Sequence, residues 1–410
     1  MPEFLNLLPP SEALELWLGH LPLQPGAEWI LTAAALGRIT AVPVISPGPL
    51  PSFPRSTVDG YAVRAADTYG ASEALPGYLK LAGEIPMGSI PAFAISPACS
   101  ALIHTGGMLP DGADAVVMLE HTQFARPGEV EILRAVAPGE NVIKLGEDIL
   151  QGQEVIPAGA RLRPAEIGGL MALGLTQVQV ASKPRVGILS SGDEVVPPQA
   201  DPLPGQVRDV NSYSLGALVE QAGGLPERYG ILPDRPEALQ QVAAQALSEC
   251  DLVVITAGSS ASARDYTSQV IDLLGAPGVL AHGVNVRPGK PTILAVCQGK
   301  PVIGLPGNPV SALVIASLFL VPAIERLLGL RRVFPRPVVS ARLSLNLSSQ
   351  AGREDWVPVR LIQEGAETLA EPVFGKSNLI FTLVRAAGLV RIPPDATGLD
   401  AGERVEVILL

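Results

Sequence analysis

Apolar residues between Arg185 and about Leu330 fall into short continuous runs that are separated by helical segments. Such runs are typical of strands that are buried on both faces of a parallel sheet. Their alternation with helices predicts a doubly wound α/β domain with a mostly parallel sheet. The runs are Val186-Gly-Ile-Leu, Asp251-Leu-Val-Val-Ile, Thr292-Ile-Leu-Ala-Val and Pro301-Val-Ile-Gly, and helices are expected after Asn211, after Asp265 and from Val310 onward.

The pattern changes in the N-terminal half of the chain. The first forty residues are predicted to be helical, with Ser11 as a candidate N-cap and an apolar face over Glu12 to Leu18. From Pro47 to Lys144, Pro and Gly recur every few residues among short apolar runs, which indicates a small inserted β domain. Gln153 to Val180 has the pattern of a strand, a helix from Pro164 and a second strand.

After Pro335 the chain shows short apolar runs that fit a small terminal β-barrel. These runs are Val338 to Leu345, Trp356 to Ile362, Leu389 to Ile392 and Val405 to Leu409. The predicted fold class is therefore multidomain α/β. We expect a helical and mixed domain at 1–48 and 147–182, an inserted β-rich domain at 49–146, a doubly wound α/β domain at 183–333 and a β-barrel at 334–410.

The length of the chain limits the number of domains, and its charge limits the kinds of partner it can bind. A chain of 410 residues with 47% hydrophobic content can bury several cores, which favours a protein of two to four domains. It carries 29 basic and 40 acidic residues, a formal charge of −11, and no cluster of Lys and Arg of the nucleic-acid type. Nucleic acid is therefore not expected as a partner. An anionic substrate would require cations and amides to be concentrated locally.

Other sequence signals concern the compartment. The most apolar stretch, Val310 to Ile324, is short for a membrane span and is interrupted by Ser311, Ser317 and Pro322, so we interpret it as a buried helix. The N-terminus has no secretory signal pattern, and we expect a cytoplasmic protein without membrane attachment. The three cysteines, Cys99, Cys250 and Cys297, are scattered, which argues against a disulfide framework or a zinc site.

The strongest chemical signal is Arg287-Pro-Gly-Lys290-Pro, followed one strand later by Gly304-Leu-Pro-Gly-Asn-Pro and an apolar helix. Pro306 and Pro309 fix φ, Gly307 allows a ligand to approach the backbone, and Asn308 can cap the helix. A helix start of this kind favours an oxyanion. The alternative is that Pro-Gly-Asn-Pro only forms a tight turn between strand and helix. Lys290, one strand earlier, favours the anion site.

Acidic residues follow two other predicted strands. Asp193 and Glu194 come after a Gly at a strand end, and ligands bind at the carboxyl ends of strands in such sheets. Their oxygens suit Mg²⁺ that bridges to phosphate, although Asp193 can equally be a turn cap. Asp265 is likewise a helix cap or a metal ligand. The loop before it contains Gly258, Ser259 and Ser260, whose hydroxyl and amide donors favour a ligand site.

The N-terminal half contains three polar loops. Pro51 to Asp59 places Arg55, Ser56, Thr57 and Asp59 in an irregular segment, which is either a solvated turn or a ligand gate. His104-Thr105-Gly-Gly offers a hydroxyl and two amides, and His104 is expected to pack or to form a hydrogen bond. Asp148 stands at the return from the inserted domain, where it is as easily a hinge residue as a ligand contact.

Six motifs in this order resemble the MoeA-type molybdopterin molybdenumtransferases, a family related to the E domain of gephyrin. They are Ser56-Thr-Val-Asp59-Gly-Tyr-Ala-Val, Thr105-Gly-Gly-Met-Leu-Pro-Asp-Gly-Ala-Asp-Ala-Val-Val, Gly146-Glu-Asp-Ile, Ser191-Gly-Asp-Glu194, Arg287-Pro-Gly-Lys-Pro and Leu305-Pro-Gly-Asn-Pro-Val-Ser. The resemblance implies a MogA-like α/β domain that binds molybdopterin and an elongated homodimer. The mixed domain would mediate dimerisation, and the cleft would lie between the α/β domain of one subunit and the inserted domain of the other.

The resemblance also implies a reaction, in which adenylylated molybdopterin and molybdate give molybdenum-bound cofactor and AMP with the help of Mg²⁺. Asp193, Glu194 and Asp265 would handle Mg²⁺ and the adenylyl phosphates. Lys290 and the turn formed by Gly307, Asn308 and Pro309 would hold anionic groups. Asp59, Thr105 and Asp148 would complete the cleft from the partner subunit. A molybdopterin adenylyltransferase and recipient molybdoenzymes are the expected partners.

The chain departs from the resemblance at Ala257 to Asp265, where family members commonly have Ser-Gly-Gly-Val-Ser. Ser259 replaces the second glycine, and its side chain can crowd a phosphate or replace an amide contact by a hydroxyl. The segment after Gly375 also differs from the usual small-residue pattern. Two alternatives follow. The protein is a non-catalytic carrier of molybdenum cofactor or a dimeric scaffold, or it is the same enzyme acting on tungstate.

Overall fold

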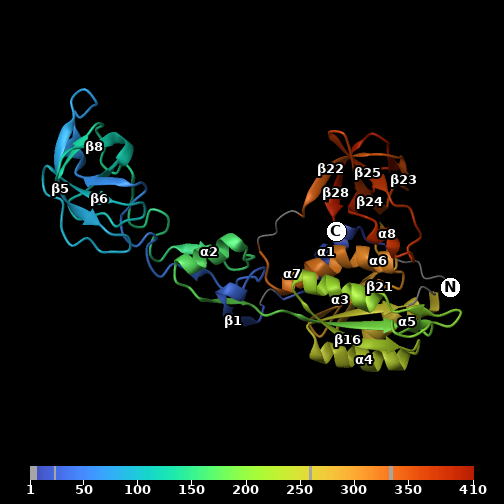
Figure 1. Ribbon diagram of the computed structural model, residues 1–410. Helices are drawn as coiled ribbons and strands as arrows, with labels where there is room; N and C mark the ends of the chain where they lie inside the picture. Colours follow the sequence, from blue (N-terminus) through green and yellow to red (C-terminus); the bar gives the residue numbers. More distant parts are fainter. Residues whose placement is uncertain (1–6, 23–24, 258–260, 332–335) are drawn as a thin grey trace.

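The computed structural model describes residues 7–22, 25–257, 261–331 and 336–410, with the backbone alone at 125, 257 and 261–265. The molecule is elongated, and its parts follow one another along the long axis (Figure 1). The inserted β domain forms one end and a small mixed domain forms the middle. The α/β domain and the C-terminal barrel lie together at the other end.

The α/β domain is built on a six-stranded sheet, and the predicted doubly wound architecture is confirmed. The strand order is β16-β13-β17-β21-β20-β18, in which the first four strands are mutually parallel and β20 runs antiparallel to both of its neighbours, β21 and β18. The strands are β13 (Arg185–Ser191), β16 (Leu225–Leu232), β17 (Leu252–Ala257), β18 (Pro277–His282), β20 (Ile293–Cys297) and β21 (Lys300–Pro306). The apolar pattern did not predict β16 and β18, which carry exposed or polar residues.

Helices cover both faces of this sheet, as a doubly wound fold requires (Figure 1). One face packs on α1 (Pro10–Gly19), α3 (Asn211–Ala222), α6 (Pro309–Ile315) and α7 (Val321–Leu327), with a π-helical stretch at Ala316–Leu320. The other face packs on α4 (Pro236–Glu249) and α5 (Ala261–Leu273). Proline stands in the first turn of α1, α4 and α6, where its missing N–H costs no helical hydrogen bond.

Two sequence-based expectations about helices were wrong. The first forty residues are not all helical: α1 ends at Gly19, and Ala27–Leu31 is a strand. Ser11 does not cap α1, because Pro9 occupies the N-cap position. The buried Trp17 joins α1 to the α/β sheet by donating from Nε1 to the carbonyl oxygen of Ala295 at 2.7 Å.

The apolar stretch from Pro309 to Leu327 is long and apolar enough to cross a membrane by composition alone. However, 56% of it is buried inside the protein, and Ile315 and Phe319 belong to the main core. Its packing is that of a core helix, as the sequence predicted.

The middle domain combines two short antiparallel strand pairs with one helix. Its elements are β1 (Ala27–Leu31), a 3₁₀ turn at Thr32–Ala34, β2 (Val44–Ile45), β11 (Glu154–Ile156), α2 (Pro164–Ala172) and β12 (Gln177–Ala181). The predicted order of strand, helix and strand between 153 and 180 is confirmed. These elements enclose a small apolar core of their own around Leu162 and Leu170.

The inserted domain has a six-stranded sheet of order β7-β4-β6-β5-β9-β8. Its elements are β3 (Arg55–Ser56), β4 (Gly60–Val63), β5 (Gly77–Ile85), β6 (Cys99–Ile103), β7 (Ala115–Met118), β8 (Thr122–Arg126), β9 (Glu129–Ile132) and β10 (Val142–Ile143), with 3₁₀ turns at Ala65–Thr68 and Leu119–His121. The chain enters and leaves this domain through a neck in which Leu50 and Ile149 exchange two backbone hydrogen bonds, of 2.8 and 3.0 Å.

The C-terminal domain is a closed five-stranded barrel, as predicted. Closure comes from pairing of β24 with β26 in addition to the order β24-β25-β22-β28-β26. The barrel strands are β22 (Val338–Leu343), β24 (Glu354–Glu364), β25 (Glu367–Pro372), β26 (Gly388–Ile392) and β28 (Arg404–Leu409), accompanied by β23 (Leu347–Ser348), α8 (Phe381–Val384) and β27 (Gly398–Leu399). A strand from the α/β domain, β19 (Val286–Arg287), extends the sheet by pairing with β24.

Candidate functional site

The carboxyl ends of β13, β17 and β21 lie side by side because these three strands are parallel neighbours. A cavity of about 300 Å³ opens at this edge. Four of the predicted site residues line this cavity. They are Glu194, which follows β13, and Gly307, Asn308 and Pro309, which follow β21. The short strands β14 (Val195–Val196) and β15 (Val207–Arg208) form its outer wall.

Two hydrogen bonds from other parts of the chain hold the turn between β21 and α6. The side-chain amide of Asn211 donates to the carbonyl oxygen of Gly307 at 2.8 Å. The N–H of Val310 donates to the carbonyl oxygen of Ser377, in the C-terminal domain, at 3.0 Å. Asn308 occupies the N-cap position, but its side chain makes no capping hydrogen bond, which corrects the expectation that it caps the helix through its side chain. Pro309 begins the helix, as predicted.

The floor of the cavity is a buried polar cluster around Asp209. This carboxylate accepts hydrogen bonds from the hydroxyl of Ser190 at 3.3 Å and from the N–H and hydroxyl of Ser212. Thr256 extends the cluster by donating to the hydroxyl of Ser190 at 3.4 Å. The sequence reasoning missed Asp209, although an Asp two residues before a predicted helix is an N-terminal signal.

Asp193, Glu194 and Asp234 follow the ends of β13 and β16, and their charges influence one another. The backbone N–H of Asp234 donates to Oδ1 of Asp193 at 3.2 Å. Burial, followed by the charges of Glu194 and Asp193, raises the pKa of the Asp234 carboxyl, although a hydrogen bond from Ser191 opposes the shift. The site therefore carries concentrated negative charge. Asp234 was missed because it follows β16, which the apolar pattern did not reveal.

The predicted metal ligands are only partly assembled in the described structure. No group of three or more His, Cys, Asp or Glu side chains within the described part of the chain is arranged to hold a metal ion. Gly258, Ser259 and Ser260 lie outside the described residues, and so does the side chain of Asp265. The backbone corrects one expectation, because α5 begins at Ala261 and Asp265 lies inside the helix rather than before it.

The two predicted cations lie on the same edge of the sheet but not in the cavity wall. The antiparallel register pairs Ile293 with Gly304, so the segment before β20 lies beside the end of β21. Lys290 is exposed three residues before that strand. Arg287 is 65% exposed, and its guanidinium pairs with the Asp355 carboxylate of the barrel at 3.7 Å.

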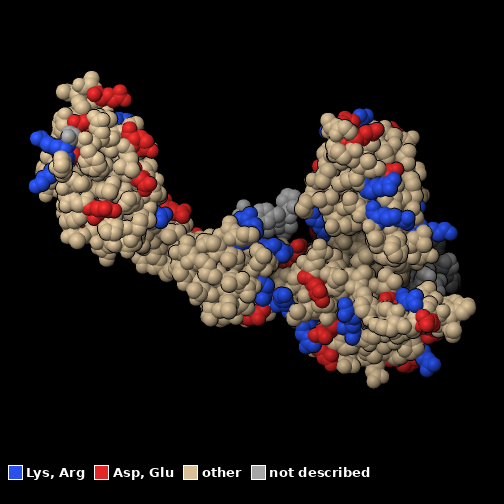
Figure 2. Space-filling model, viewed as in Figure 1, with Lys and Arg blue, Asp and Glu red and all other residues tan. Residues whose placement is uncertain are grey.

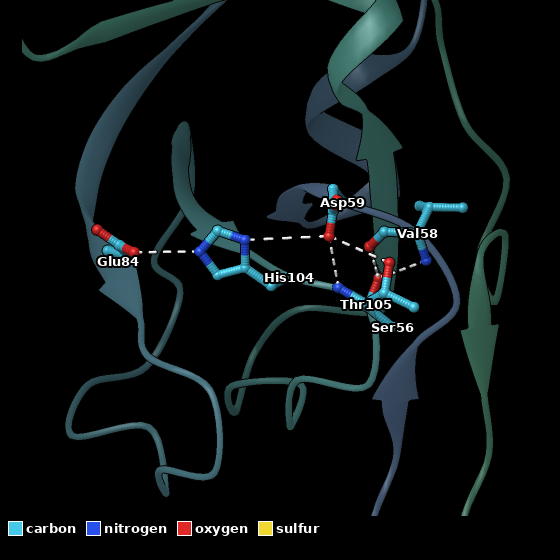
Figure 3. Close-up of polar contacts among 6 residues, drawn as sticks. All are labelled: Ser56, Val58, Asp59, Glu84, His104 and Thr105. Carbon is cyan, nitrogen blue, oxygen red and sulfur yellow. Dashed lines mark hydrogen bonds and ion pairs between the residues drawn. The ribbon is translucent and has the colours of Figure 1, made fainter.

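A second polar cluster lies in the inserted domain (Figure 3). Oδ1 of Asp59 accepts hydrogen bonds from the backbone N–H of Thr105 at 2.7 Å and from its hydroxyl at 3.1 Å. These bonds, and more weakly the charge of His104, lower the pKa of the Asp59 carboxyl. His104 lies between Asp59 at 3.9 Å and Glu84 at 3.1 Å, so the expected hydrogen bond of this histidine is present.

Asp148 lies at the neck of the inserted domain, where its N–H donates to the carbonyl oxygen of Leu50 at 3.1 Å. It lines a separate cavity of about 250 Å³ together with α2. The inserted domain, to which Asp59 and Thr105 belong, lies at the opposite end of the molecule from the α/β domain, with the middle domain and the Asp148 cavity between them (Figure 1). One chain brings together the residues at the strand ends, but it does not bring the inserted-domain residues to them.

Comparisons with known proteins cover nearly the whole chain. Three family descriptions match: MoeA N-terminal region (domain I and II) at residues 8–174, probable molybdopterin binding domain at 187–326, and MoeA C-terminal region (domain IV) at 340–410.

Two curated relatives, from Nostoc sp. and Haemophilus influenzae, are named molybdopterin molybdenumtransferase. The first is 35% identical over 95% of this chain and 90% of its own length, and the second is 31% identical over 97% of each. A solved structure described as the molybdopterin biosynthesis moeA protein from Pyrococcus horikoshii OT3 matches with a TM-score of 0.86 at 31% identity, and covers 99% of this chain and 100% of that one.

Proposed function

The chain belongs to the MoeA family and is a molybdopterin molybdenumtransferase of molybdenum cofactor biosynthesis, and we propose that it acts on adenylylated molybdopterin and molybdate and releases AMP. One observation carries this choice of substrate. The cavity at the strand ends brings acidic residues, backbone donors and a helix start to a single edge of the sheet. An adenylylated pterin offers this edge a phosphoanhydride, whose charge suits amides and a cation.

The acidic residues fit Mg²⁺ in their donor chemistry. Asp193, Glu194 and Asp234 supply carboxylate oxygens, which this ion prefers. Burial is the main cause of the raised pKa of Asp234, and the charges of Glu194 and Asp193 add to it; a cation would relieve this repulsion. Asp193 and Glu194 would hold Mg²⁺ with phosphate oxygens of the substrate and with Asp265. When bound, the ion would neutralise charge on the phosphoanhydride as it breaks.

The chain's own residues would bind and orient the reactants. The turn of Gly307 to Pro309 is held by Asn211 and by Ser377, so its position is fixed before the substrate arrives. Lys290, on the same edge, would attract molybdate, a dianion. Attack of water on the phosphoanhydride would release AMP and leave the pterin with its own phosphate, free to take up the metal.

A homodimer would supply the remaining groups. Asp59 and Thr105 lie at the opposite end of the chain from the cavity, so a partner subunit would have to provide them (Figure 1). The middle domain supports association, because its Trp29, Leu31 and Leu36 are exposed by 60–65%. Figure 2 shows basic side chains where this domain meets the α/β domain and few charges on the rest of its visible face. Sedimentation should give a dimer that Trp29→Asp dissociates and that Leu75→Asp, an equally exposed position of the inserted domain, leaves intact.

The test of the proposed function is AMP release from adenylylated molybdopterin by the purified chain with Mg²⁺, with and without molybdate. Detection of molybdenum-bound pterin accompanies it. We expect release that depends on molybdate and a metal-bound product. Tight binding of the adenylylated pterin without release under either condition would refute the enzymatic proposal and favour a carrier or a scaffold. Parallel assays with tungstate would identify the metal used.

The reaction places the protein between two others. An adenylyltransferase must supply the activated pterin, and molybdoenzymes must receive the product. We propose the cytoplasm as the compartment for this exchange. Pull-down with the full chain during turnover would test whether either partner binds directly.

A further inference from the structure

The C-terminal barrel is paired by backbone hydrogen bonds to the start of the cationic loop of the α/β domain, residues Arg287 to Lys290. Strand β19 contains Arg287, the first residue of Arg287-Pro-Gly-Lys290, and it runs parallel to β24 of the barrel. The register pairs Val286 with Glu354 and Arg287 with Asp355. The loop that presents Lys290 therefore begins as an added strand of the barrel sheet.

The Asp355 side chain is one of the contacts between the barrel and this loop. It is 3% exposed, yet two guanidinium groups surround its carboxylate. Arg353 donates to both carboxylate oxygens, at 2.7 and 3.0 Å, and Arg287 lies 3.7 Å from Oδ2. The bidentate pairing with Arg353 fixes the orientation of the Asp355 carboxylate. Arg287 meets this fixed carboxylate through a single, longer ion pair, and its own side chain is 65% exposed.

The other side of the same loop is fixed by the α/β domain. A Cβ added to Gly289 would lie 2.2 Å from Cγ1 of Ile315 in α6, so the loop backbone is packed directly on that helix. The buried hydroxyl of Thr292 donates to the carbonyl oxygen of Gly289 at 2.6 Å. The loop therefore lies between Asp355 on one side and α6 on the other.

We propose that Asp355 is a positioning residue for the transferase reaction: it holds Arg287, and through it the Arg287–Lys290 loop, in the place where the loop receives the oxyanion. The inference rests on the proposed function, because it takes molybdate as that oxyanion. Asp355 touches no substrate itself. It acts by giving a cationic loop a fixed geometry, so its loss should weaken oxyanion binding more than the chemical step.

The test compares Asp355→Asn with Glu354→Gln in the full-length protein. Glu354 is the matched control, because it neighbours Asp355 on β24, is similarly buried, and is bonded by Trp356 and Arg391 instead of the loop. The readouts are KM for molybdate and kcat in the AMP-release assay, molybdate affinity by isothermal titration calorimetry, and the melting temperature.

For Asp355→Asn we expect KM and the calorimetric Kd for molybdate to rise by up to about fivefold with little change in kcat, because Arg287 is 65% exposed and solvent screens its ion pair. Glu354→Gln should leave both constants unchanged. Adding Arg287→Gln to Asp355→Asn should weaken binding no further than Arg287→Gln alone, since Asp355 acts through that arginine.

Three results would overturn the inference. They are an equal effect of Glu354→Gln, a loss of stability or kcat with unchanged molybdate affinity, and additivity with Arg287→Gln. If Asp355→Asn does not fold, Asp355→Glu is the substitute, because it keeps the negative charge but moves the carboxylate relative to Arg287. An unchanged affinity of Asp355→Glu for molybdate would also overturn the inference. Absence of molybdate-dependent turnover in the unaltered protein would instead refute the proposed function, whereas calorimetry would still report on Asp355.

Discussion

The side-chain amide of Asn211, at the start of α3, donates a hydrogen bond of 2.8 Å to the carbonyl oxygen of Gly307 in the turn before α6. This bond crosses from one strand-end loop to another and forms part of the cavity wall. The other amide atom of Asn211, Oδ1, is buried without a hydrogen-bond partner among the described residues. The side-chain N–H of Asn211 therefore supports the turn, while its side-chain oxygen accepts no hydrogen bond from the described residues.

Asn211→Asp should show how much the hydrogen bond to Gly307 contributes to stability and binding. A carboxylate cannot donate to Gly307, and its charge would face a carbonyl oxygen, so the turn should lose its support. We expect a loss of about 1–3 kcal/mol in the free energy of unfolding, with weaker binding of adenylylated molybdopterin. Asn378→Asp, also in the cavity wall, adds the same charge without breaking this bond. If the two variants bind the pterin equally weakly, charge alone explains the effect.

Asp234→Asn should raise stability at neutral pH. The pKa of this carboxyl is raised in the folded protein, so its ionised form is disfavoured there. The folded state therefore gains relative to the unfolded state below pH 3.8, the ordinary value, and this gain is lost as pH rises through the raised pKa. Removing the charge should raise the urea midpoint at pH 7–8, and the difference from the unaltered protein should shrink as pH falls toward 3.8.

Activity should move in the opposite direction in Asp234→Asn, since the crowded carboxylates serve the reaction. The exposed Asp395 provides the control, because Asp395→Asn removes a charge far from this cluster. A midpoint gain of the same size in Asp395→Asn would show that the effect comes from net charge.

Thr105→Val should raise the pKa of Asp59. The threonine hydroxyl and N–H both stabilise the ionised carboxylate, and the valine retains only the N–H. Carboxyl titration by ¹³C NMR should show the pKa of Asp59 moving up toward 3.8. Thr122→Val removes a hydroxyl of the same domain that bonds to Leu119, so it should leave the titration unchanged. An unaltered pKa in Thr105→Val would mean that the hydroxyl bond is weak in solution.

Gly289→Ala should destabilise the α/β domain by about 1–3 kcal/mol, as expected for overpacking. Its φ is +112°, and the new methyl would lie 2.2–2.4 Å from side-chain atoms of Ile315. Gly299→Ala is the matched control, since Gly299 also has a positive φ of +77° but no atom within 4 Å of the added methyl. Urea unfolding should rank the two variants. The additional loss caused by Gly289→Ala should be smaller when it is measured against Ile315→Ala, because that change makes room for the methyl. Equal losses would attribute the effect to backbone strain alone.

The architecture of the α/β domain was predictable because its central strands are buried on both faces. Strands β13, β17 and β21 read as continuous apolar runs, and their parallel order places their ends together. Edge strands β16 and β18 lacked this signal because one side of each is exposed, and Asp234 was missed along with β16.

The individual contacts of the site were less predictable, because they join segments far apart in the sequence. Asn308 looks like a helix cap from its position, but its side chain does not serve as one, and Asn211 supports the turn instead. Likewise, Arg287 was predicted as an anion ligand, and its pairing with Asp355 depends on a register between two domains that no local pattern reveals.

The neck of the inserted domain has a consequence for how this chain can be divided. Leu50 and Ile149 pair as neighbours on antiparallel segments, so the first and last residues of the inserted domain lie side by side. If the inserted domain were removed here, a short turn could join the two remaining chain ends. The segment between Leu50 and Ile149 thus leaves and rejoins the rest of the chain at one place, so its removal would leave the strands that enclose the cavity intact.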